Sequence, residues 1–215
     1  MPVVRTVSVG RPRESAWIGD KATSIEKLPV IGPVEVSALG LEGDQVSDTI
    51  HHGGLDQAVY VYAREDLDRW VESLDRPIRD GQFGENLTTS GIDVNAAEVG
   101  ERWRIGTALF EVASVRTPCY KFQAWMGVSG FDNAQWVRRF AAEGRPGPYL
   151  RVLEAGRIAA GDELTVLHRP GHGVSVSMLF RALTFEPALL PRLLDVDGLI
   201  ERARHKAEAY VAART

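Results

Sequence analysis

The sequence predicts a mainly β fold with added α-helices, in which a β-barrel carries peripheral helices and a small helical appendage at its C-terminal end. Before residue 170, seven short segments are rich in β-branched or aromatic residues and are bounded by Gly, Pro or Asp, as strands are. Few helical patterns separate them, which favours a barrel over a doubly wound parallel sheet. Beyond residue 173 helical patterns take over. We therefore expect a barrel domain over residues 1–170 and a three-helix extension over residues 174–213.

The individual elements follow from periodicity and turn residues. Strands are expected at residues 3–9, 33–39, 58–62, 102–105, 108–115, 149–154 and 164–167. Two peripheral helices are expected over residues 64–74 and 132–143, because apolar residues recur there at helical spacing. The extension is expected to form short helices over residues 177–183, 186–194 and 198–213. It is too short to fold alone, so we expect it to pack on the barrel or on a partner chain.

Composition excludes several classes of protein. The 215 residues are 44% hydrophobic and 25% charged with a net charge of −4, which is ordinary for a chain with a sizeable core. A mild acidic balance without a basic run argues against nucleic acid or a membrane surface as the main partner. No apolar stretch approaches the roughly 20 residues that span a bilayer, and the N-terminus lacks a signal-peptide pattern. We expect a cytoplasmic protein.

The single cysteine, Cys119, excludes an intrachain disulfide and any multi-cysteine zinc or iron–sulfur cage. It lies in the segment RTPCYK, residues 116–121, directly after an expected strand. Pro118 holds the preceding residue extended, so Cys119 leaves the strand in a defined direction. Arg116 and Lys121 are nearby cations, which favour the thiolate form of a cysteine. Two interpretations stay open at this point, a metal-binding or reactive thiolate and a buried cysteine that acts as a small hydrophobe.

Two further segments combine glycines with polar side chains. His51 and His52 precede Gly53 and Gly54, whose conformational freedom would let a ligand approach the backbone closely. A tight turn with one imidazole in solvent explains the same residues. The segment FGENLTT, residues 83–89, offers an amide and two hydroxyl groups that suit phosphate or pterin recognition, although such residues also form ordinary turns and strand edges.

Lys27 lies two residues before Pro29, and its role has two interpretations. A lysine serves as a compact positive charge for a phosphate, or is simply solvated on a loop. Other common motifs are missing from the sequence: it contains no GxxxxGK[ST], no GxGxxG that opens a helix, no HExxH and no GxSxG.

The order of these segments resembles the MOSC domain, named for the C-terminal domain of molybdenum-cofactor sulfurases. The matching segments are GLEGD at 40–44, HGG at 52–54, AVY at 58–60, FGENLTT at 83–89, VGE at 99–101, RTPCYK at 116–121, GRI at 156–158 and GD at 161–162. Together they cover nearly all of residues 1–168. The helical tail is similar to the three-helix extension of stand-alone bacterial MOSC proteins.

The resemblance implies a barrel-centred fold that carries molybdenum bound to molybdopterin. It implies that Cys119 is the sulfur ligand of the metal and the central catalytic residue. By the same resemblance Asn86 and Thr88 help to hold the pterin and its phosphate, Thr117 lines the same wall, and Lys27 sits against the phosphate.

His52 and Gly53 match the HGG signature, which implies that both help to build the cofactor pocket. A histidine is also the residue best suited to pass a proton near neutral pH, so His52 is the second catalytic candidate.

The family includes amidoxime-reducing components and bacterial proteins that detoxify hydroxylaminopurine, so the resemblance implies an oxidoreductase that reduces N-hydroxylated small molecules. No segment predicts a flavin, haem or iron–sulfur site, so electrons would come from a separate flavin or iron–sulfur reductase. A homodimer is compatible with the helical tail. Two alternatives stay open: a carrier that holds sulfur or cofactor through a cysteine persulfide, and a barrel that only scaffolds a partner.

Overall fold

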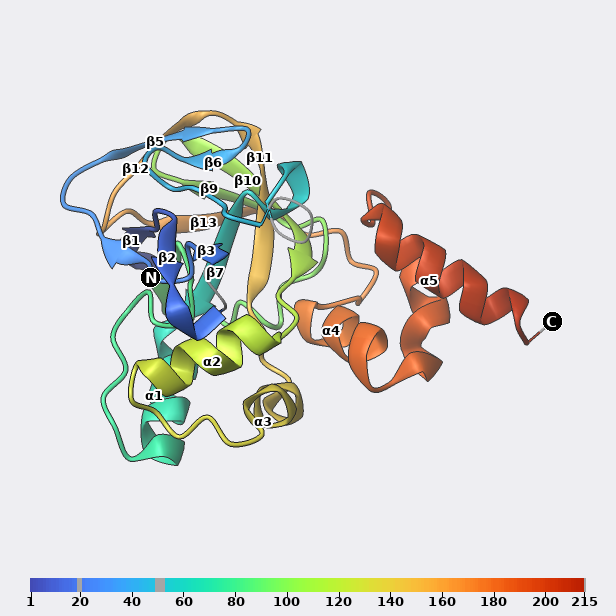
Figure 1. Cartoon of the computed structure of the whole chain (residues 1–215). Coiled ribbons are helices and arrows are strands. Elements are labelled where there is room, and N and C mark those ends of the chain that lie inside the picture. Colours follow the sequence, from blue (N-terminus) through green and yellow to red (C-terminus); the bar gives the residue numbers. More distant parts are fainter. Residues whose placement is uncertain (19–20, 49–52, 215) are drawn as a thin grey trace.

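A computed structural model describes residues 1–18, 21–48 and 53–214, and its largest element is an eight-stranded sheet. The strand order is β13-β9-β10-β11-β7-β8-β1-β4 (Figure 1). The strands are β1 (Val3–Val9), β4 (Leu28–Pro29), β7 (Val59–Ala63), β8 (Leu87–Ser90), β9 (Arg102–Ile105), β10 (Ala108–Val115), β11 (Pro148–Glu154) and β13 (Leu164–His168). All neighbours are antiparallel except β7 and β8, which run parallel. The prediction of a mainly β fold with peripheral helices is confirmed.

The sheet curls but is not closed into a barrel by a continuous strand ladder, which corrects that detail of the prediction. Strand β1, next to the edge strand β4, meets the start of β13 at an isolated antiparallel bridge between Val3 and Glu163. Three backbone hydrogen bonds support this contact, from Val4 N to Asp162 O at 2.9 Å, from Gly161 N to Val4 O at 2.8 Å and from Leu164 N to Pro2 O at 2.9 Å. The reason is local: the chain turns at Gly161, where φ is +95°, so a turn and not a strand faces β1.

Two smaller sheets complete the β structure. One has the order β12-β5-β6, formed by β12 (Gly156–Ile158), β5 (Val34–Ser37) and β6 (Gly40–Leu41). The other is the hairpin of β2 (Arg13–Ser15) and β3 (Lys21–Thr23). Two short 3₁₀ helices, η1 (Ala16–Ile18) and η2 (Leu55–Gln57), lie in the connections.

Three helices cover one end of the sheet (Figure 1): α1 (Arg64–Leu74), α2 (Tyr120–Val128) and α3 (Trp136–Glu143). Beneath them lies a cluster of aromatic rings with neighbouring centroids 4.7 to 6.4 Å apart, formed by Tyr62, Trp70, Phe83, Phe122, Trp136 and Phe140. Strand β7 runs into this cluster with all five of its residues buried. Such a continuous buried run is typical of a strand covered on both faces. This packing fixes β7 and the start of α2, and each of them contributes a residue to the cavity described below.

The chain ends in a helical unit formed by α4 (Val176–Thr184), the 3₁₀ helix η3 (Pro187–Asp195) and α5 (Glu201–Ala212). The expected positions of these three helices are confirmed to within three residues at each end. Ser175 caps α4, because its hydroxyl accepts a hydrogen bond from Met178 N at 3.1 Å. Backbone bonds from Val176 N to Ala97 O and from Ser177 N to Asn95 O tie α4 to the sheet domain. Figure 1 shows α5 pointing away from the sheet. The division into two domains stays a prediction.

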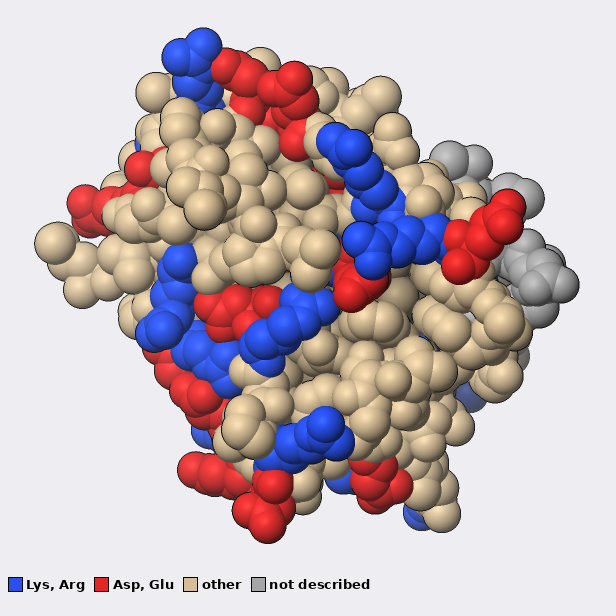
Figure 2. All heavy atoms as spheres, turned by 60° about the vertical axis from the view of Figure 1, so that its left-hand side comes forward, with Lys and Arg blue, Asp and Glu red and all other residues tan. Residues whose placement is uncertain are grey.

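Among the described residues, no helix is long and apolar enough to cross a membrane. On the face of the molecule shown in Figure 2, basic and acidic side chains lie next to one another, with wide uncharged areas between them. The expectation that neither nucleic acid nor a membrane is a partner stays a prediction.

Candidate functional site

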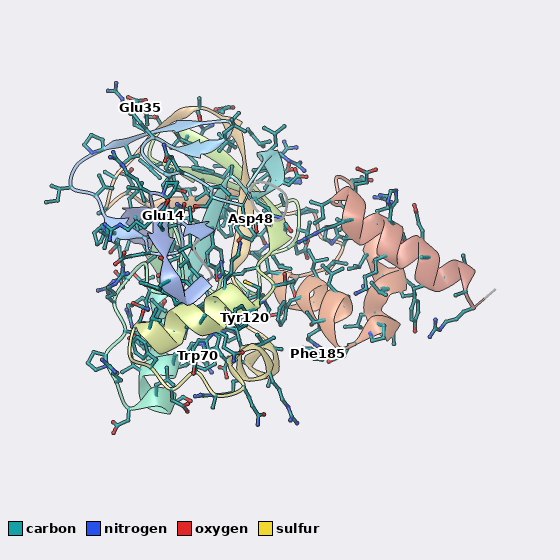
Figure 3. The ribbon with its side chains drawn as sticks, viewed as in Figure 1. Glu14, Glu35, Asp48, Trp70, Tyr120 and Phe185 are labelled. Atoms are coloured by element: carbon teal, nitrogen blue, oxygen red, sulfur yellow. The ribbon has the colours of Figure 1, made fainter. Side chains whose placement is uncertain are left out.

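A cavity lies among β7, β11, the start of α2 and the segments around residues 22–27 and 44–48. Its empty volume is about 710 Å³, including the open mouth. An open concavity lined by both polar and apolar side chains suits a small-molecule or cofactor site. Figure 3 shows Asp48, one of the lining residues, above the end of α2 that carries Tyr120. The cavity brings together segments as far apart in the sequence as Ala22 and Tyr149.

Cys119 lines this cavity as a free, partly exposed thiol. Strand β10 ends at Val115 and α2 begins at Tyr120, so Cys119 occupies the N-cap position of the helix in an extended conformation with φ −137° and ψ 170°. Its carbonyl oxygen accepts the hydrogen bond of Gln123 N at 3.1 Å, which anchors the residue to the first turn of the helix. The structure thus excludes a cysteine walled in by hydrocarbon, and it leaves the sulfur within reach of a ligand.

Lys27 and Asp44 form a buried ion pair in the cavity wall. Lys27 Nζ lies 2.5 Å from Asp44 Oδ1, and the two side chains are only 10% and 9% exposed. Burial lowers the pKa of Lys27 below its usual value of 10.5, while the charge of Asp44 opposes that shift. Asp44 Oδ1 also accepts a hydrogen bond from Gly10 N at 2.6 Å. The pair therefore locks the end of β1 to the loop after β6.

Asn86 joins the same network through its side-chain amide. Asn86 Nδ2 donates to Asp44 Oδ2 at 2.9 Å and to Ser8 O at 3.2 Å. Its Oδ1 accepts from Tyr60 N at 3.1 Å, and the residue is 3% exposed. Both amide protons are thus used within the protein, and one lone pair of Oδ1 is left for a ligand. Asn86 lines the cavity mainly as the residue that positions β1, β7 and Asp44.

Glu85 is buried behind the cavity wall and organises the loop that carries Asn86. Its carboxylate accepts hydrogen bonds from Gly81 N at 2.6 Å, from Phe83 N at 2.9 Å and from Thr88 Oγ1 at 3.1 Å. Complete burial raises the pKa of Glu85 to about 7, although these hydrogen bonds act in the opposite direction. The Thr88 hydroxyl is therefore directed at Glu85.

The structure brings together four of the seven predicted site residues. Cys119, Lys27, Asn86 and Gly53 all line the cavity. Gly53 has φ +78°, and a side chain there would meet Val46 at 3.2 Å, so the position requires glycine.

Two of the other three predicted residues, Thr88 and Thr117, do not line the cavity. Thr88 is fully buried, and Thr117 is half-buried outside the lining. His52, the predicted proton-transfer residue, lies outside the described residues. Their roles stay predictions.

Sequence reasoning underrated two lining residues. The motif GLEGD contains Asp44 but indicates no role for it, whereas the side chain lines the cavity. The sequence indicates only that Arg116 is a cation near Cys119, whereas the structure places it in the cavity wall with 6% of its surface exposed. Arg116 Nε is buried without a hydrogen-bond partner. Lys121, on the other side of Cys119, pairs with Asp48 at 2.7 Å. Arginine side chains are seldom buried, so an exposed position is the ordinary expectation for Arg116 from the sequence.

The described residues contain no group of three or more His, Cys, Asp or Glu side chains that could hold a metal ion. A metal bound through the sulfur of Cys119 would therefore find fewer than three such ligands among the described residues and would need further donors from elsewhere. An organic cofactor that carries the metal meets this requirement, and the buried Arg116, whose Nε has no hydrogen-bond partner, fits the anionic group of such a cofactor. The residues present thus fit a metal that arrives bound to an anionic ligand.

Residues 48–165 match the family model of the MOSC domain. The match covers more than half of the chain, so the protein belongs to the MOSC domain family, which is associated with the molybdenum cofactor. The family predicted from the sequence is confirmed.

Among individual relatives, the chain is similar to stand-alone MOSC proteins. It is 35% identical to protein YflK of Bacillus subtilis over 83% of this chain and 79% of that protein. It is 31% identical to protein YiiM of Escherichia coli over 76% of this chain and 72% of that one. A protein of Gibberella moniliformis named a reductase is 33% identical, over 78% of this chain but only 30% of the fungal protein.

Solved structures agree with this assignment. The crystal structure of YiiM from Geobacillus stearothermophilus superposes with a TM-score of 0.80 at 25% identity, covering 98% of this chain and 100% of that one. YiiM from Escherichia coli superposes with a TM-score of 0.75 at 24% identity, covering 100% and 94%, and this second likeness concerns the fold alone.

Proposed function

We propose that the protein is a molybdenum-cofactor-dependent oxidoreductase that reduces N-hydroxylated compounds, namely hydroxylamines, amidoximes or N-hydroxylated bases. The observation that carries the proposal is the free thiol of Cys119, which is partly exposed in the cavity. The described residues offer no cluster of three or more metal-binding side chains beside it. Soft metals prefer sulfur donors, and molybdopterin supplies a dithiolene that the thiolate completes. Membership of the MOSC family and the reductase name of one relative support the same class.

When bound, the cofactor would supply two-electron redox chemistry at the metal. The chain's own task is to bind, orient and shield it. Cys119, held at the start of α2, would provide the protein ligand, and Arg116 would place positive charge against the anionic group. Tyr60 and Tyr149 form part of the wall with their rings 5.1 Å apart, and they offer flat, mostly apolar surface for the pterin or for a planar substrate.

The overall reaction consumes two electrons and two protons: the N–O bond of an N–OH group breaks, an amine remains, and the oxygen leaves as water. The electrons would come from a separate flavin or iron–sulfur reductase. The free thiol suits a reducing compartment, so we propose that the protein acts in the cytoplasm.

The test uses protein purified from a host that makes the cofactor, with a chemical reductant and a hydroxylamine base analogue. The wild type should form the amine, and Cys119→Ala should lose at least a hundredfold in kcat/KM, on the order of 3 kcal/mol of transition-state stabilisation. Ser129→Ala, which alters a hydroxyl at the far end of α2, is the control and should keep full activity. Full activity in Cys119→Ala would end the proposal. A wild type that contains a cysteine persulfide but no molybdenum would instead support a sulfur carrier.

A further inference from the structure

Arg116 is a buried cation that pairs with no carboxylate in the described part of the cavity wall, where its polar neighbours are the hydroxyl group of Tyr149 and the thiol of Cys119. The two carboxylates there already pair with lysines, Asp44 with Lys27 and Asp48 with Lys121. The residue is 6% exposed, and the hydrogen of its Nε has no acceptor. Burying a charge is unfavourable unless the charge is paired or hydrogen-bonded. An anion that enters the cavity would remove this penalty.

The immediate neighbours of Arg116 hold its guanidinium group in place. The guanidinium carbon lies 5.1 Å from the ring centroid of Tyr60 and 4.6 Å from that of Phe122. Cation–π contacts of this kind orient the planar group without neutralising it. The N–H donors of the planar fork match the geometry of a phosphate or carboxylate.

Lys27 is in the opposite situation, although it lies in the same wall. Its charge is matched by Asp44 at 2.5 Å, and both side chains are about nine-tenths buried. An oxyanion bound directly to Lys27 would lie next to the Asp44 carboxylate and be repelled by it. Replacing Asp44 as the partner of Lys27 would also disturb the hydrogen bonds that Asp44 accepts from Gly10 and Asn86.

We propose that Arg116, and not Lys27, is the principal ligand of an oxyanion in this cavity, and that Lys27 is the structural counter-ion of Asp44. The inference depends on the proposed function only for the source of the oxyanion, which is either the phosphate of the cofactor or an acidic group of the substrate. It reverses the assignment that the resemblance implies for Lys27.

The experiment measures binding of inorganic phosphate to the full-length protein purified without cofactor, by isothermal titration calorimetry and by ³¹P line broadening. Arg116→Met should weaken phosphate binding about ten- to a hundredfold, the loss of a charge-assisted hydrogen bond. Arg116→Lys should bind with intermediate affinity because it keeps the charge and loses the fork. Lys27→Met should stay within about threefold of the wild type, since a charge matched by Asp44 adds little net attraction.

Arg139→Met is the matched control. Arg139 also lies over two aromatic rings, 5.9 Å from Trp70 and 5.7 Å from Trp136, but it does not line the cavity. This variant should bind phosphate like the wild type. Circular dichroism checks that each variant is folded, and if Lys27→Met does not fold, the comparison of Arg116→Met with Arg139→Met decides.

Three results would overturn the inference: phosphate binding unchanged in Arg116→Met, phosphate binding weakened in a folded Lys27→Met as much as in Arg116→Met, or no phosphate binding by the wild type. The source of the oxyanion follows from the molybdenum and pterin content of protein made in a cofactor-competent host. If Arg116→Met contains less molybdenum and pterin than the wild type, the site binds the phosphate of the cofactor. A normal content with a raised KM only for acidic substrates assigns it to the substrate. A wild type without molybdenum would contradict the proposed function and leave the phosphate result unaffected.

Discussion

The amide nitrogen of Asn86 lies 2.9 Å from a carboxylate oxygen of Asp44, and this single hydrogen bond joins the two halves of the cavity wall. Asp44 holds Lys27 and the end of β1 on one side, while Asn86 holds Tyr60 of β7 on the other. The contact therefore couples the stability of the fold to the shape of the cavity.

Asn86→Asp should destabilise the protein by about 3 kcal/mol at pH 8, because it places a second buried carboxylate beside Asp44 and removes two hydrogen-bond donors. Urea unfolding followed by circular dichroism measures the loss. Asn133→Asp is the control, since the side chain of Asn133 donates a hydrogen bond to Gln123 O and lies outside the cavity. An equal loss of stability in both variants would contradict the role given to Asn86.

Gly84→Ala should combine backbone strain with a steric conflict in the cavity wall. Gly84 has φ +79°, and an added Cβ would lie 3.2 Å from Ile25 Cγ1 and 3.3 Å from Ile25 O. Gly171→Ala is matched, with φ +84° and no atom within 4 Å of the added Cβ. We expect about 1 kcal/mol of destabilisation at Gly171 from φ alone and at least about twice that at Gly84. Thermal unfolding of the two variants measures the difference in stability. An equal loss of stability in both would show that Ile25 moves away from the added Cβ at no cost.

Glu85 should make the protein less stable as the pH rises through neutrality. Burial raises the pKa of its carboxyl group to about 7 in the folded state, above the ordinary 4.5, so the folded state binds more protons than the unfolded state between these values. Its contribution is fully present below about pH 4.5 and is lost as the pH rises through 7, by an amount on the order of a few kcal/mol.

Urea unfolding across that pH range tests the contribution of Glu85. Glu85→Gln, which cannot titrate, should show a flatter dependence of the free energy of unfolding on pH than the wild type. Glu14→Gln, at an exposed position of the β2–β3 hairpin, should keep the wild-type slope. Parallel curves for wild type and Glu85→Gln would mean that Glu85 stays ionised throughout, held by its three hydrogen-bond donors.

The long strands and the amphipathic helix α1 could be predicted from the sequence because their own residues carry the signal. Strands β1, β9 and β10 and helix α1 have the bounds that periodicity indicated. Strands such as β4 and β6 have two residues each, too few for any alternation to be visible, and they exist because a neighbouring strand supplies their partners. Helix α2 was missed for another reason: its residues YKFQAWMGV show no clear apolar stripe.

The candidate site shows the same division. Cys119 could be singled out because a lone cysteine behind a proline is visible in the sequence, and its place beside a cavity agrees with that interpretation. The resemblance implies a ligand-binding role for Thr88, and its hydrogen bond to the buried Glu85 could not be predicted because only the folded chain places β8 beside that carboxylate. The burial of Arg116 depends on the rings of Tyr60 and Phe122, which only the tertiary fold brings to it.

X-ray absorption at the molybdenum K-edge, on protein made in a cofactor-competent host, tests most directly whether the sulfur of Cys119 binds the metal. The wild type should show a set of sulfur neighbours around molybdenum that falls by one in Cys119→Ala, while Ser129→Ala leaves the set unchanged. An identical sulfur count in the wild type and in Cys119→Ala would contradict the assignment of Cys119 as the metal ligand.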